Sequence, residues 1–289
     1  MKALKRLPIL VLALFLLGIG PFCWWQNNGL VVTKMEYKND RSPVGFREYR
    51  IVQVSDLHNK EFGKGNARLL DKLRECQPDI IVITGDLIDS RKTKVAVALK
   101  CIKQMAEVAP VYYVSGNHEY NSGQYATLKE ELVAVGATVL DNSGFILERD
   151  GEQIALIGLA DTAFFEYGND YMAENKDIFA QELADLATEY HGMFTILLSH
   201  RPEKMSVYVA QDIDLVFAGH AHGGQFRLPL LGGLVAPDQG LFPKYTSGLY
   251  EQGLVFGIKK IAWEALLPIA PLLLRSPEVV YVCGYTAVD

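Results

Sequence analysis

The placement of histidine is the feature that most constrains what this chain can fold into. Five of its six histidines come shortly after apolar runs that are typical of buried strands, and only His191 lies in a predicted loop. The five are His58, His118, His200, His220 and His222. Ligands of open α/β sheets collect at the carboxyl ends of the strands, so we expect these imidazoles to share one site.

Apolar runs alternate with stretches of helical spacing through the first half of the chain. Strands are expected at 49–54, 79–84 and 111–114, and helices at 66–76, 95–108 and 128–135. Residues 79–84 are apolar on both faces, as in a parallel sheet that is covered on both sides. This alternation predicts an α/β domain whose sheet includes parallel strands.

The second half of the chain adds a hairpin and further strands. Asp150-Gly151 lies between two apolar runs and predicts a hairpin turn. A helix is expected at 178–190, and strands at 194–198 and 215–218. These elements suggest a second sheet that packs against the first.

The N-terminal stretch 7–25 carries no charge and is long enough to cross about 30 Å of hydrocarbon. Three basic residues precede it and two tryptophans close it, as in a membrane anchor whose basic end stays in the cytoplasm. A cleaved signal peptide is the alternative, but its apolar stretch is usually shorter and ends in a small-x-small site. We therefore expect a single-pass anchor (1–25), a linker with an edge strand (26–48) and an extracytoplasmic domain (49–289).

Charge and cysteine content narrow the classes of partner. The net charge is −6 and no basic stripe is present, which argues against nucleic acid as the main partner. The four cysteines show no pairing pattern. Cys76 and Cys101 fall in predicted helices, where free buried thiols are expected.

The polar residues at the five strand ends form a mixed set of nitrogen and oxygen ligands. The set comprises Asp56, His58, Asp86, Asn117, His118, His200, His220 and His222. Without a thiolate it suits Mn, Fe, Zn or Co and excludes a cysteine-type structural zinc site. The set is too large for one ion and about right for two divalent ions.

Two cations about 3.5–4 Å apart need a bridging carboxylate, and they lower the pKa of a shared water toward neutrality. Hydroxide then becomes available without a dedicated protein base. Phosphate ester hydrolysis is the reaction that most needs this chemistry, because the charge on the phosphate oxygens must be screened. The ligand set therefore predicts attack on phosphorus by a metal-bridging hydroxide.

In order and spacing these residues resemble the calcineurin-like metallophosphoesterase superfamily. The matching motifs are Asp56-x-His58, Gly85-Asp86, Gly116-Asn117-His118-Glu119, Ser199-His200 and Gly219-His220-x-His222. They span about residues 51–225 and look most like the membrane-anchored bacterial branch, which carries Gly-His-x-His-Gly-Gly-Gln. Some members of that branch cleave UDP-2,3-diacylglucosamine in lipid A biosynthesis. The resemblance implies an α/β fold of two packed mixed β-sheets flanked by helices, a four-layer sandwich.

The resemblance also implies a role for each residue of the ligand set. Asp56, His58 and His222 would bind the first metal ion, Asp86 would bridge, and Asn117, His200 and His220 would bind the second. His118 would lie beside the leaving group and donate a proton or a hydrogen bond. Catalysis would therefore depend on His118 and Asp86.

Three stretches depart from the family pattern or leave alternatives open. Members often follow Gly-Asp with x-x-Asp-Arg, whereas Ser90 separates Asp89 from Arg91 here, so Asp89 either orients His118 or belongs to a turn. Arg227 either contacts a substrate phosphate or forms a surface ion pair. Residues 257–275 either touch the membrane or form an edge of the fold.

The sequence thus predicts a membrane-tethered dinuclear hydrolase that cleaves a phosphoester or pyrophosphate bond. The expected partners are the bilayer and a phosphorylated small-molecule, lipid-linked or cell-envelope substrate. UDP-linked lipids are cytoplasmic, which conflicts with the outward orientation expected from the basic N-terminus. A dinuclear hydrolase of a non-phosphate ester or amide remains an alternative. So does a non-catalytic metal-binding envelope protein, although such a protein would be expected to lack the bridging carboxylate, Asp86.

Overall fold

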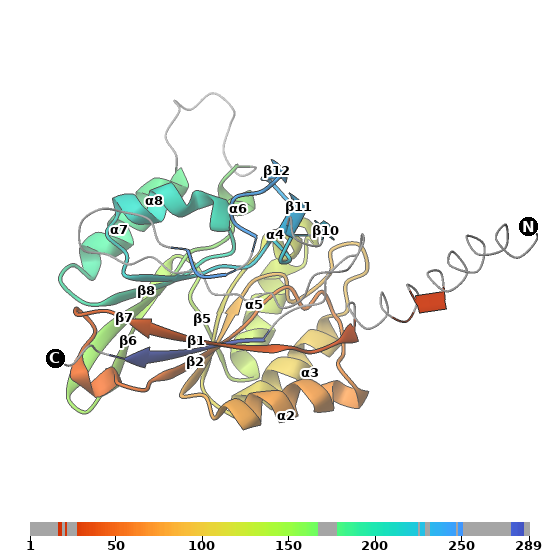
Figure 1. Ribbon diagram of the computed structural model, residues 1–289, viewed down its shortest axis with the longest axis horizontal. Coiled ribbons are helices and arrows are strands. Elements are labelled where there is room, and N and C mark those ends of the chain that lie inside the picture. The colour runs from red at the N-terminus through yellow and green to blue at the C-terminus, as the bar shows by residue number, and fades with distance from the viewer. Residues whose placement is uncertain are drawn as a thin grey trace, which may run out of the picture.

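The computed structural model contains a six-stranded sheet in the order β1-β13-β2-β3-β4-β5 (Figure 1). The strands are β1 (Val32–Lys38), β2 (Arg50–Val54), β3 (Ile80–Thr84), β4 (Val111–Val114), β5 (Ala137–Val139) and β13 (Val279–Tyr285). Strands β2 to β5 run parallel to one another. β13 is parallel to β1 and antiparallel to β2, so the sheet is mixed.

The second sheet has four strands in the order β6-β7-β8-β9. They are β6 (Ser143–Arg149), β7 (Glu152–Gly158), β8 (Thr195–Leu198) and β9 (Leu215–Phe217). β6 and β7 form the hairpin predicted at Asp150-Gly151, and β7, β8 and β9 are parallel. A third, small antiparallel sheet contains β10 (Phe226–Leu228), β11 (Gly232–Ala236) and β12 (Gly240–Leu241), and nothing in the sequence predicted it.

Helices cover the outer faces of the two large sheets (Figure 1). The helices packed on the first sheet are α2 (Ala67–Cys76), α3 (Val95–Ala106) and α5 (Tyr125–Ala134). Those packed on the second are α7 (Ile178–Glu189) and α8 (Met205–Ala210). Two short helices, α4 (Asn117–Asn121) and α6 (Ala163–Glu166), contact each other through Tyr120 and Phe164. Short 3-10 helices occupy Val44–Phe46, Lys64–Asn66 and Pro202–Lys204.

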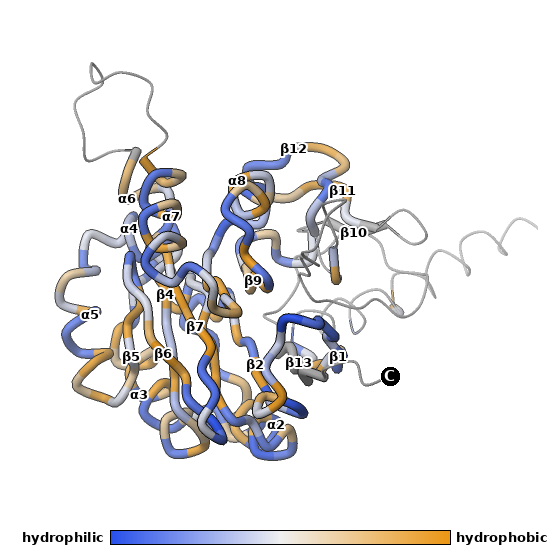
Figure 2. The backbone as a smooth tube through the Cα atoms, turned by 90° about the vertical axis from the view of Figure 1, so that its left-hand side faces the viewer, coloured by the Kyte–Doolittle hydropathy of each residue, from blue (hydrophilic) through white to orange (hydrophobic). Residues whose placement is uncertain are grey.

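Strand β3 shows why the sheets stack as they do. All five of its residues are buried, and successive side chains point to opposite faces of the sheet. Ile81 and Ile83 pack among the residues of α2 and α3, whereas Ile80 and Val82 pack among those of the second sheet. Burying each such side chain contributes roughly 1.5–3 kcal/mol. Figure 2 shows hydrophobic stretches along the central strands, including β4 and β7.

A further core cluster joins the outer face of the second sheet to its helices. Ile157 and Val216 of that sheet pack with Leu183 of α7 and Tyr208 of α8. The layers are therefore helices, sheet, sheet and helices. This arrangement confirms the predicted α/β fold of two packed mixed sheets flanked by helices. The predicted free thiols, Cys76 and Cys101, are both buried and unpaired.

The structure describes residues 17–18, 21, 28–166, 178–224, 226–228, 232–246, 248–250 and 279–285. Most of the predicted anchor and the whole of 257–275 lie outside these ranges. Among the residues that are described, no helix has the length and apolar content that a membrane crossing requires.

Candidate metal centre

The polar residues predicted to share a site do leave their strands at the same end of the two large sheets. Asp56 follows β2, Asp86 follows β3, and Asn117 follows β4, while His200 follows β8 and His220 and His222 follow β9. Each sheet therefore supplies part of the group, because the carboxyl ends of their parallel strands lie side by side.

Several of these residues hold a backbone conformation that side chains rarely adopt. Positive φ angles of 47° to 66° occur at Asp56, His58, Asp86, His220 and His222. Each left-handed residue costs about 1–2 kcal/mol, and such strain gathers at functional sites. In this conformation the chain turns sharply at the strand end, which keeps the side chains at the sheet edge.

The first group of potential ligands contains Asp56, His58, Asp86 and His222. One ligand atom from each lies within 4.8 Å of the others. His58 Nε2 is 3.7 Å from Asp86 Oδ2, and His222 Nε2 is 3.8 Å from Asp56 Oδ1. The two imidazole rings stack with their centroids 5.0 Å apart.

His58 shows that this group suits a cation. Both of its ring nitrogens are buried, and neither has a hydrogen-bond partner among the residues that the structure describes. Burial lowers the pKa of His58 to about 4, against the charges of Asp86 and Asp56, so the ring is neutral and keeps a lone pair. Leaving a buried polar atom without a partner costs about 1–3 kcal/mol, which a metal ion bound between the carboxylates would offset.

The second group surrounds His200. Its Nδ1 lies 2.6 Å from the carbonyl oxygen of Thr84, which can only accept, so Nδ1 carries a hydrogen. Its Nε2 is 3.3 Å from Asp86 Oδ2, 3.2 Å from Asn117 Oδ1 and 3.2 Å from His220 Nδ1. Asp86, His200 and His220 form the second set of atoms close enough to hold one ion.

The electrostatics of His200 also favour a cation at this point. Burial lowers the pKa of His200, but the charge of Asp86 has the opposite effect, and the net result is a pKa raised to about 10. The proton on Nε2 therefore lies among three acceptors: the Asp86 carboxylate, the Asn117 amide oxygen and the His220 imidazole. A divalent ion fits the same place, because it would replace that proton with a stronger positive charge.

Asp86 belongs to both groups and is held by its neighbours. Its carboxylate is fully buried; burial opposes ionisation, but His200 and His58 hold its pKa below the ordinary value. Asp86 Oδ1 also accepts the backbone N–H of His118 at 2.9 Å. An ionised carboxylate between two sets of ligands is what a bridging position requires.

Sequence reasoning assigned no role to Glu119, a buried carboxyl group below the site. It accepts the backbone N–H groups of Asp86 at 2.8 Å, Gly116 at 2.7 Å and Ile88 at 3.1 Å. Burial, and then the charge of Asp86, raise the pKa of Glu119, while the N–H donors of Ile88 and Gly116 oppose that shift. Glu119 thereby joins the loop after β3 to the loop after β4. Its position three residues after Gly116 is the usual place for a helix-capping acid, a signal that could have identified it.

His118 is oriented by a backbone amide. Ser90 N donates to His118 Nδ1 at 3.0 Å, whereas Asp89 Oδ1 is 3.6 Å from the same atom. The Asp89 carboxylate instead accepts the backbone N–H of Arg91 at 2.9 Å and its Nε and Nη2 at 3.0 and 2.8 Å. The structure thus favours the turn interpretation of Asp89, since the Asp89 carboxylate bonds Arg91 and the amide of Ser90 bonds His118.

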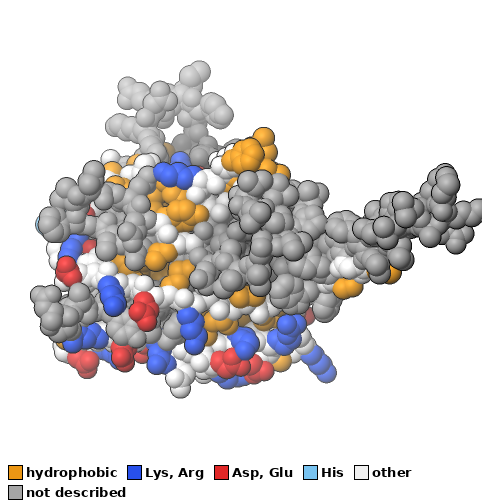
Figure 3. Space-filling view, viewed as in Figure 1, with side chains coloured by type: hydrophobic (Ala, Val, Ile, Leu, Met, Phe, Trp, Pro, Cys, Tyr) orange, Lys and Arg blue, Asp and Glu red, His pale blue; other side chains and the backbone are white. Residues whose placement is uncertain are grey.

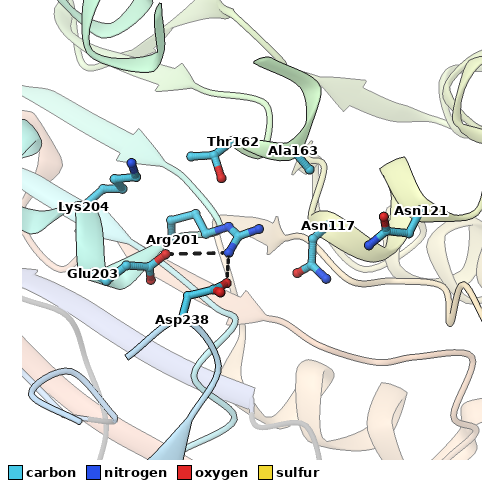
Figure 4. Close-up of a pocket in the computed structure, with 8 residues that line it drawn as sticks. All are labelled: Asn117, Asn121, Thr162, Ala163, Arg201, Glu203, Lys204 and Asp238. Atoms are coloured by element: carbon cyan, nitrogen blue, oxygen red, sulfur yellow. Dashed lines mark hydrogen bonds and ion pairs between the residues drawn. The ribbon is translucent and has the colours of Figure 1, made fainter. Parts of the chain in front are cut away.

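A cavity of about 420 Å³ opens beside Asn117 (Figure 4). Its lining is mostly polar: Asn117, Asn121, Thr162, Ala163, Arg201, Glu203, Lys204 and Asp238. Sequence reasoning missed Arg201 and Asp238, although Arg201 directly follows a predicted ligand. Arg227, the predicted substrate contact, lies in β10, and its side chain is outside the described part of the structure.

Residues 49–224 match a known protein family, the calcineurin-like phosphoesterases. The metallophosphoesterase YkuE of Bacillus subtilis (strain 168) is 29% identical over 242 residues, covering 82% of this chain and 79% of that protein. Phosphodiesterase YaeI of Escherichia coli (strain K12) is 25% identical over 223 residues, covering 75% and 74%. A transmembrane protein with metallophosphoesterase domain from Danio rerio is 30% identical over 234 residues; the match covers 76% of this chain and 49% of that protein.

Proposed function

The chain belongs to the calcineurin-like phosphoesterase family, and within it we propose a membrane-tethered dinuclear hydrolase of an amphiphilic cell-envelope substrate. As a family member it is a metal-dependent phosphoester hydrolase, and the family uses two divalent metal ions. The proposal concerns the ligands of those ions, the hydrogen-bond donor to the leaving group, the site of substrate binding and the membrane.

The observation that carries the proposal is that the two groups of ligand atoms share Asp86. Asp56, His58 and His222 would hold the first ion, and Asn117, His200 and His220 would hold the second, with Asp86 available to both. Bound there, two divalent cations lower the pKa of a water and screen the negative charge of the phosphate oxygens. The protein contributes by fixing these ligands at the sheet edge before substrate arrives.

His118 donates a hydrogen bond to the leaving group in this proposal. Because Ser90 N donates to Nδ1, the neutral ring carries its hydrogen on Nε2. The ring centroid is 4.5 Å from that of His58, so the imidazole borders the proposed metal centre. Its side chain is partly exposed and can reach a bound substrate. Nε2–H can therefore donate a hydrogen bond to the leaving oxygen as negative charge develops there and the phosphorus–oxygen bond breaks.

The cavity beside Asn117 suits the polar part of the substrate. At about 420 Å³ it falls in the range typical of small-molecule sites. Amide and hydroxyl groups of Asn117, Asn121 and Thr162 line it and can bond a nucleotide or sugar phosphate. A phosphoester or pyrophosphate group held there would lie next to the ligands of the second ion.

Three features support a lipid-linked substrate and a membrane tether. The charge-free stretch 7–25 is long enough to be an anchor, with 26–48 as linker and 49–289 as the catalytic domain. Leu241 and Phe242, at the end of β12, are each 69% exposed, and Figure 3 shows apolar side chains gathered over β12. Relatives in Danio rerio and Bos taurus are named transmembrane proteins with a metallophosphoesterase domain.

The orientation of the tether limits the substrate. With the basic end in the cytoplasm, the catalytic domain faces outward from a bacterial cell membrane. The substrate would then be a phosphate- or pyrophosphate-bearing lipid at the outer surface. A role in lipid A biosynthesis on a UDP-linked lipid requires the opposite orientation.

Metal analysis of the full-length protein in detergent, combined with turnover of bis-p-nitrophenyl phosphate, tests the central claim. Wild type should bind two divalent ions and turn over, and Asp86→Ala should lose metal and activity together. Full turnover by Asp86→Ala at unchanged metal content would overturn the dinuclear centre. A reporter fused after Asp289 tests the orientation, and a comparison of phosphorylated lipid in vesicles with its water-soluble headgroup tests the substrate class.

A further inference from the structure

His220 lies between the proposed second metal site and a chain of charged residues behind it. Its Nδ1 is 3.2 Å from His200 Nε2, so this atom faces the second group of ligands. Its Nε2 faces the other way and is 2.8 Å from Asp238 Oδ2. The ring can bind a metal through Nδ1 only if the ring hydrogen is on Nε2.

Two neighbours of opposite character compete for His220 Nε2. Arg201 Nη1 is 3.0 Å from it and can only donate, so a bond between them would place the ring hydrogen on Nδ1. Asp238 Oδ2 can only accept when ionised, so a bond to it places the hydrogen on Nε2. The carboxylate therefore decides which of the two ring nitrogens keeps its lone pair.

Arg201 is itself fixed and is not available to an anionic ligand. Its Nε and Nη2 donate to the two carboxylate oxygens of Asp161 at 2.6 and 2.8 Å, and both residues are buried. Its Nη1 donates to Asp238, as the dashed line in Figure 4 shows. The guanidinium occupies the space among Glu203, His220 and Asp238, which excludes a third metal ion from that acidic group.

Asp238 reaches this position through the small third sheet. It lies in the turn between β11 and β12, and its backbone has a positive φ of 53°. The next residue, Gln239, holds the turn in place: its amide bonds the backbone N–H and C=O of Tyr245 at 2.8 and 2.6 Å. The β11–β12 turn thus carries a carboxylate to the rear of His220.

We infer that Asp238 is a positioning residue for the second metal ion, and that the chain Asp161–Arg201–Asp238 holds it against His220 so that Nδ1 faces the metal. The inference rests on the proposed dinuclear centre. Removing a carboxylate that orients a metal-binding histidine typically weakens metal binding by roughly 10- to 100-fold. Here the effect should fall on one of the two ions, because the first group of ligands makes no contact with Asp238 in the described structure.

The test is a Mn²⁺ titration of metal-free, full-length protein in detergent, monitored by calorimetry and by electron paramagnetic resonance. Wild type should bind two ions and show the spectrum of a coupled pair. Asp238→Ala should bind the first ion with unchanged affinity and the second roughly 10- to 100-fold more weakly. Asp238→Asn keeps an oxygen that can accept from Nε2–H, so it should recover most of the affinity.

Asp185→Ala is the control, because Asp185 is an exposed carboxylate on α7 whose side chain bonds Gln181 at 2.9 Å. It should leave both affinities unchanged. Nitrogen NMR of the metal-free protein, labelled in histidine, should find the hydrogen of His220 on Nε2 in wild type and on Nδ1 in Asp238→Ala. Equal second-ion affinity in wild type and Asp238→Ala would overturn the inference alone, whereas a wild type that binds one ion would overturn the proposed function as well.

Discussion

The side chain of Glu119 accepts a hydrogen bond at 2.8 Å from the backbone N–H of Asp86, which lies 33 residues earlier in the sequence. The same carboxyl group accepts the N–H groups of Gly116 and Ile88. In return, Asp86 Oδ1 accepts the backbone N–H of His118, the residue before Glu119. The two loops that supply the shared ligand Asp86 and the proposed hydrogen-bond donor His118 are therefore joined by hydrogen bonds in both directions.

Glu119→Ala should destabilise the protein. The substitution leaves three buried N–H groups without an acceptor, each at a cost of about 1–3 kcal/mol, so the free energy of unfolding should fall by about 3 kcal/mol or more. Chemical denaturation measures this change. The control is Glu130→Ala, an exposed carboxylate on α5. Similar stability of the two variants would contradict the role of Glu119 as a tie.

Metal binding at the second group should release a proton and strengthen as pH rises. The charge of Asp86 raises the pKa of His200 to about 10 against the effect of burial, so below that pH Nε2 holds a proton that a metal must displace. Affinity should then rise about tenfold per pH unit between pH 7 and 9. His58, with a pKa lowered to about 4, contributes no proton in this range.

Calorimetric Mn²⁺ titrations in two buffers of different ionisation enthalpy count the released protons. We expect His200 to release about one proton, and we expect this release to accompany the weaker of the two binding events. Binding of both ions with no dependence on pH from 7 to 9 would show that His200 is already neutral in the metal-free protein.

His118→Asn should slow turnover without removing metal. Removing one hydrogen-bond donor to developing negative charge typically costs about 10²- to 10³-fold, so kcat should fall in that range for esters with poor leaving groups and less for p-nitrophenyl esters. His191→Asn is the matched control, because His191 is exposed and outside the site. Loss of bound metal in His118→Asn, with the same rate loss for every leaving group, would point to a ligand instead of a donor.

Gly85→Ala should damage the site through crowding. Gly85 has φ +91°, and a Cβ there would lie 2.5 Å from His200 Nδ1 and 2.7 Å from Gly116 Cα. Gly151, in the hairpin turn, also has a positive φ but has open space around it. Gly151→Ala should therefore show the backbone cost alone, about 1–2 kcal/mol, and Gly85→Ala should exceed it and weaken binding of the second metal. Thermal unfolding and metal content measure the two effects.

The double variant Leu241→Ser/Phe242→Ser should impair hydrolysis of a phosphorylated lipid in vesicles and spare a soluble diester. Each side chain is 69% exposed. Burial of each side chain in lipid would contribute roughly 1.5 kcal/mol to substrate binding. Because the double variant loses at least part of this contribution, its KM for the lipid should rise about tenfold or more. Val133→Ser, another exposed apolar position, is the control. Equal losses of activity on both substrates would show that Leu241 and Phe242 stabilise the fold instead of contacting lipid.

Local pattern and chemistry predicted the elements that carry the site. Residues 79–84 are apolar on both faces, which predicted a strand covered on both sides, and β3 is buried throughout. The ligand residues could be placed because each follows such a strand within a few positions. Parallel strands present their carboxyl ends at one edge, so residues that directly follow these strands in the sequence lie close together in the structure.

Relationships that depend on distant pairing could not be predicted in this way. β13 joins the sheet between β1 and β2 across a long stretch of chain, and no local pattern specifies its neighbours. Asp238 lies in a turn whose sequence resembles any polar loop; only the third sheet brings it to His220. No local pattern shows that the amide of Ser90 lies closer to His118 Nδ1 than the Asp89 carboxylate does, at 3.0 Å against 3.6 Å.

The place of β13 also sets an order on the assembly of the protein. Residues 32–38 leave the ribosome early, yet among the described residues their strand pairs only with 279–285. The edge of the nascent sheet at β2 stays open until more than two hundred further residues have been made. Completion of the main sheet is therefore a late event, and a chain that stops before residue 279 leaves an unpaired edge available to other unfinished chains.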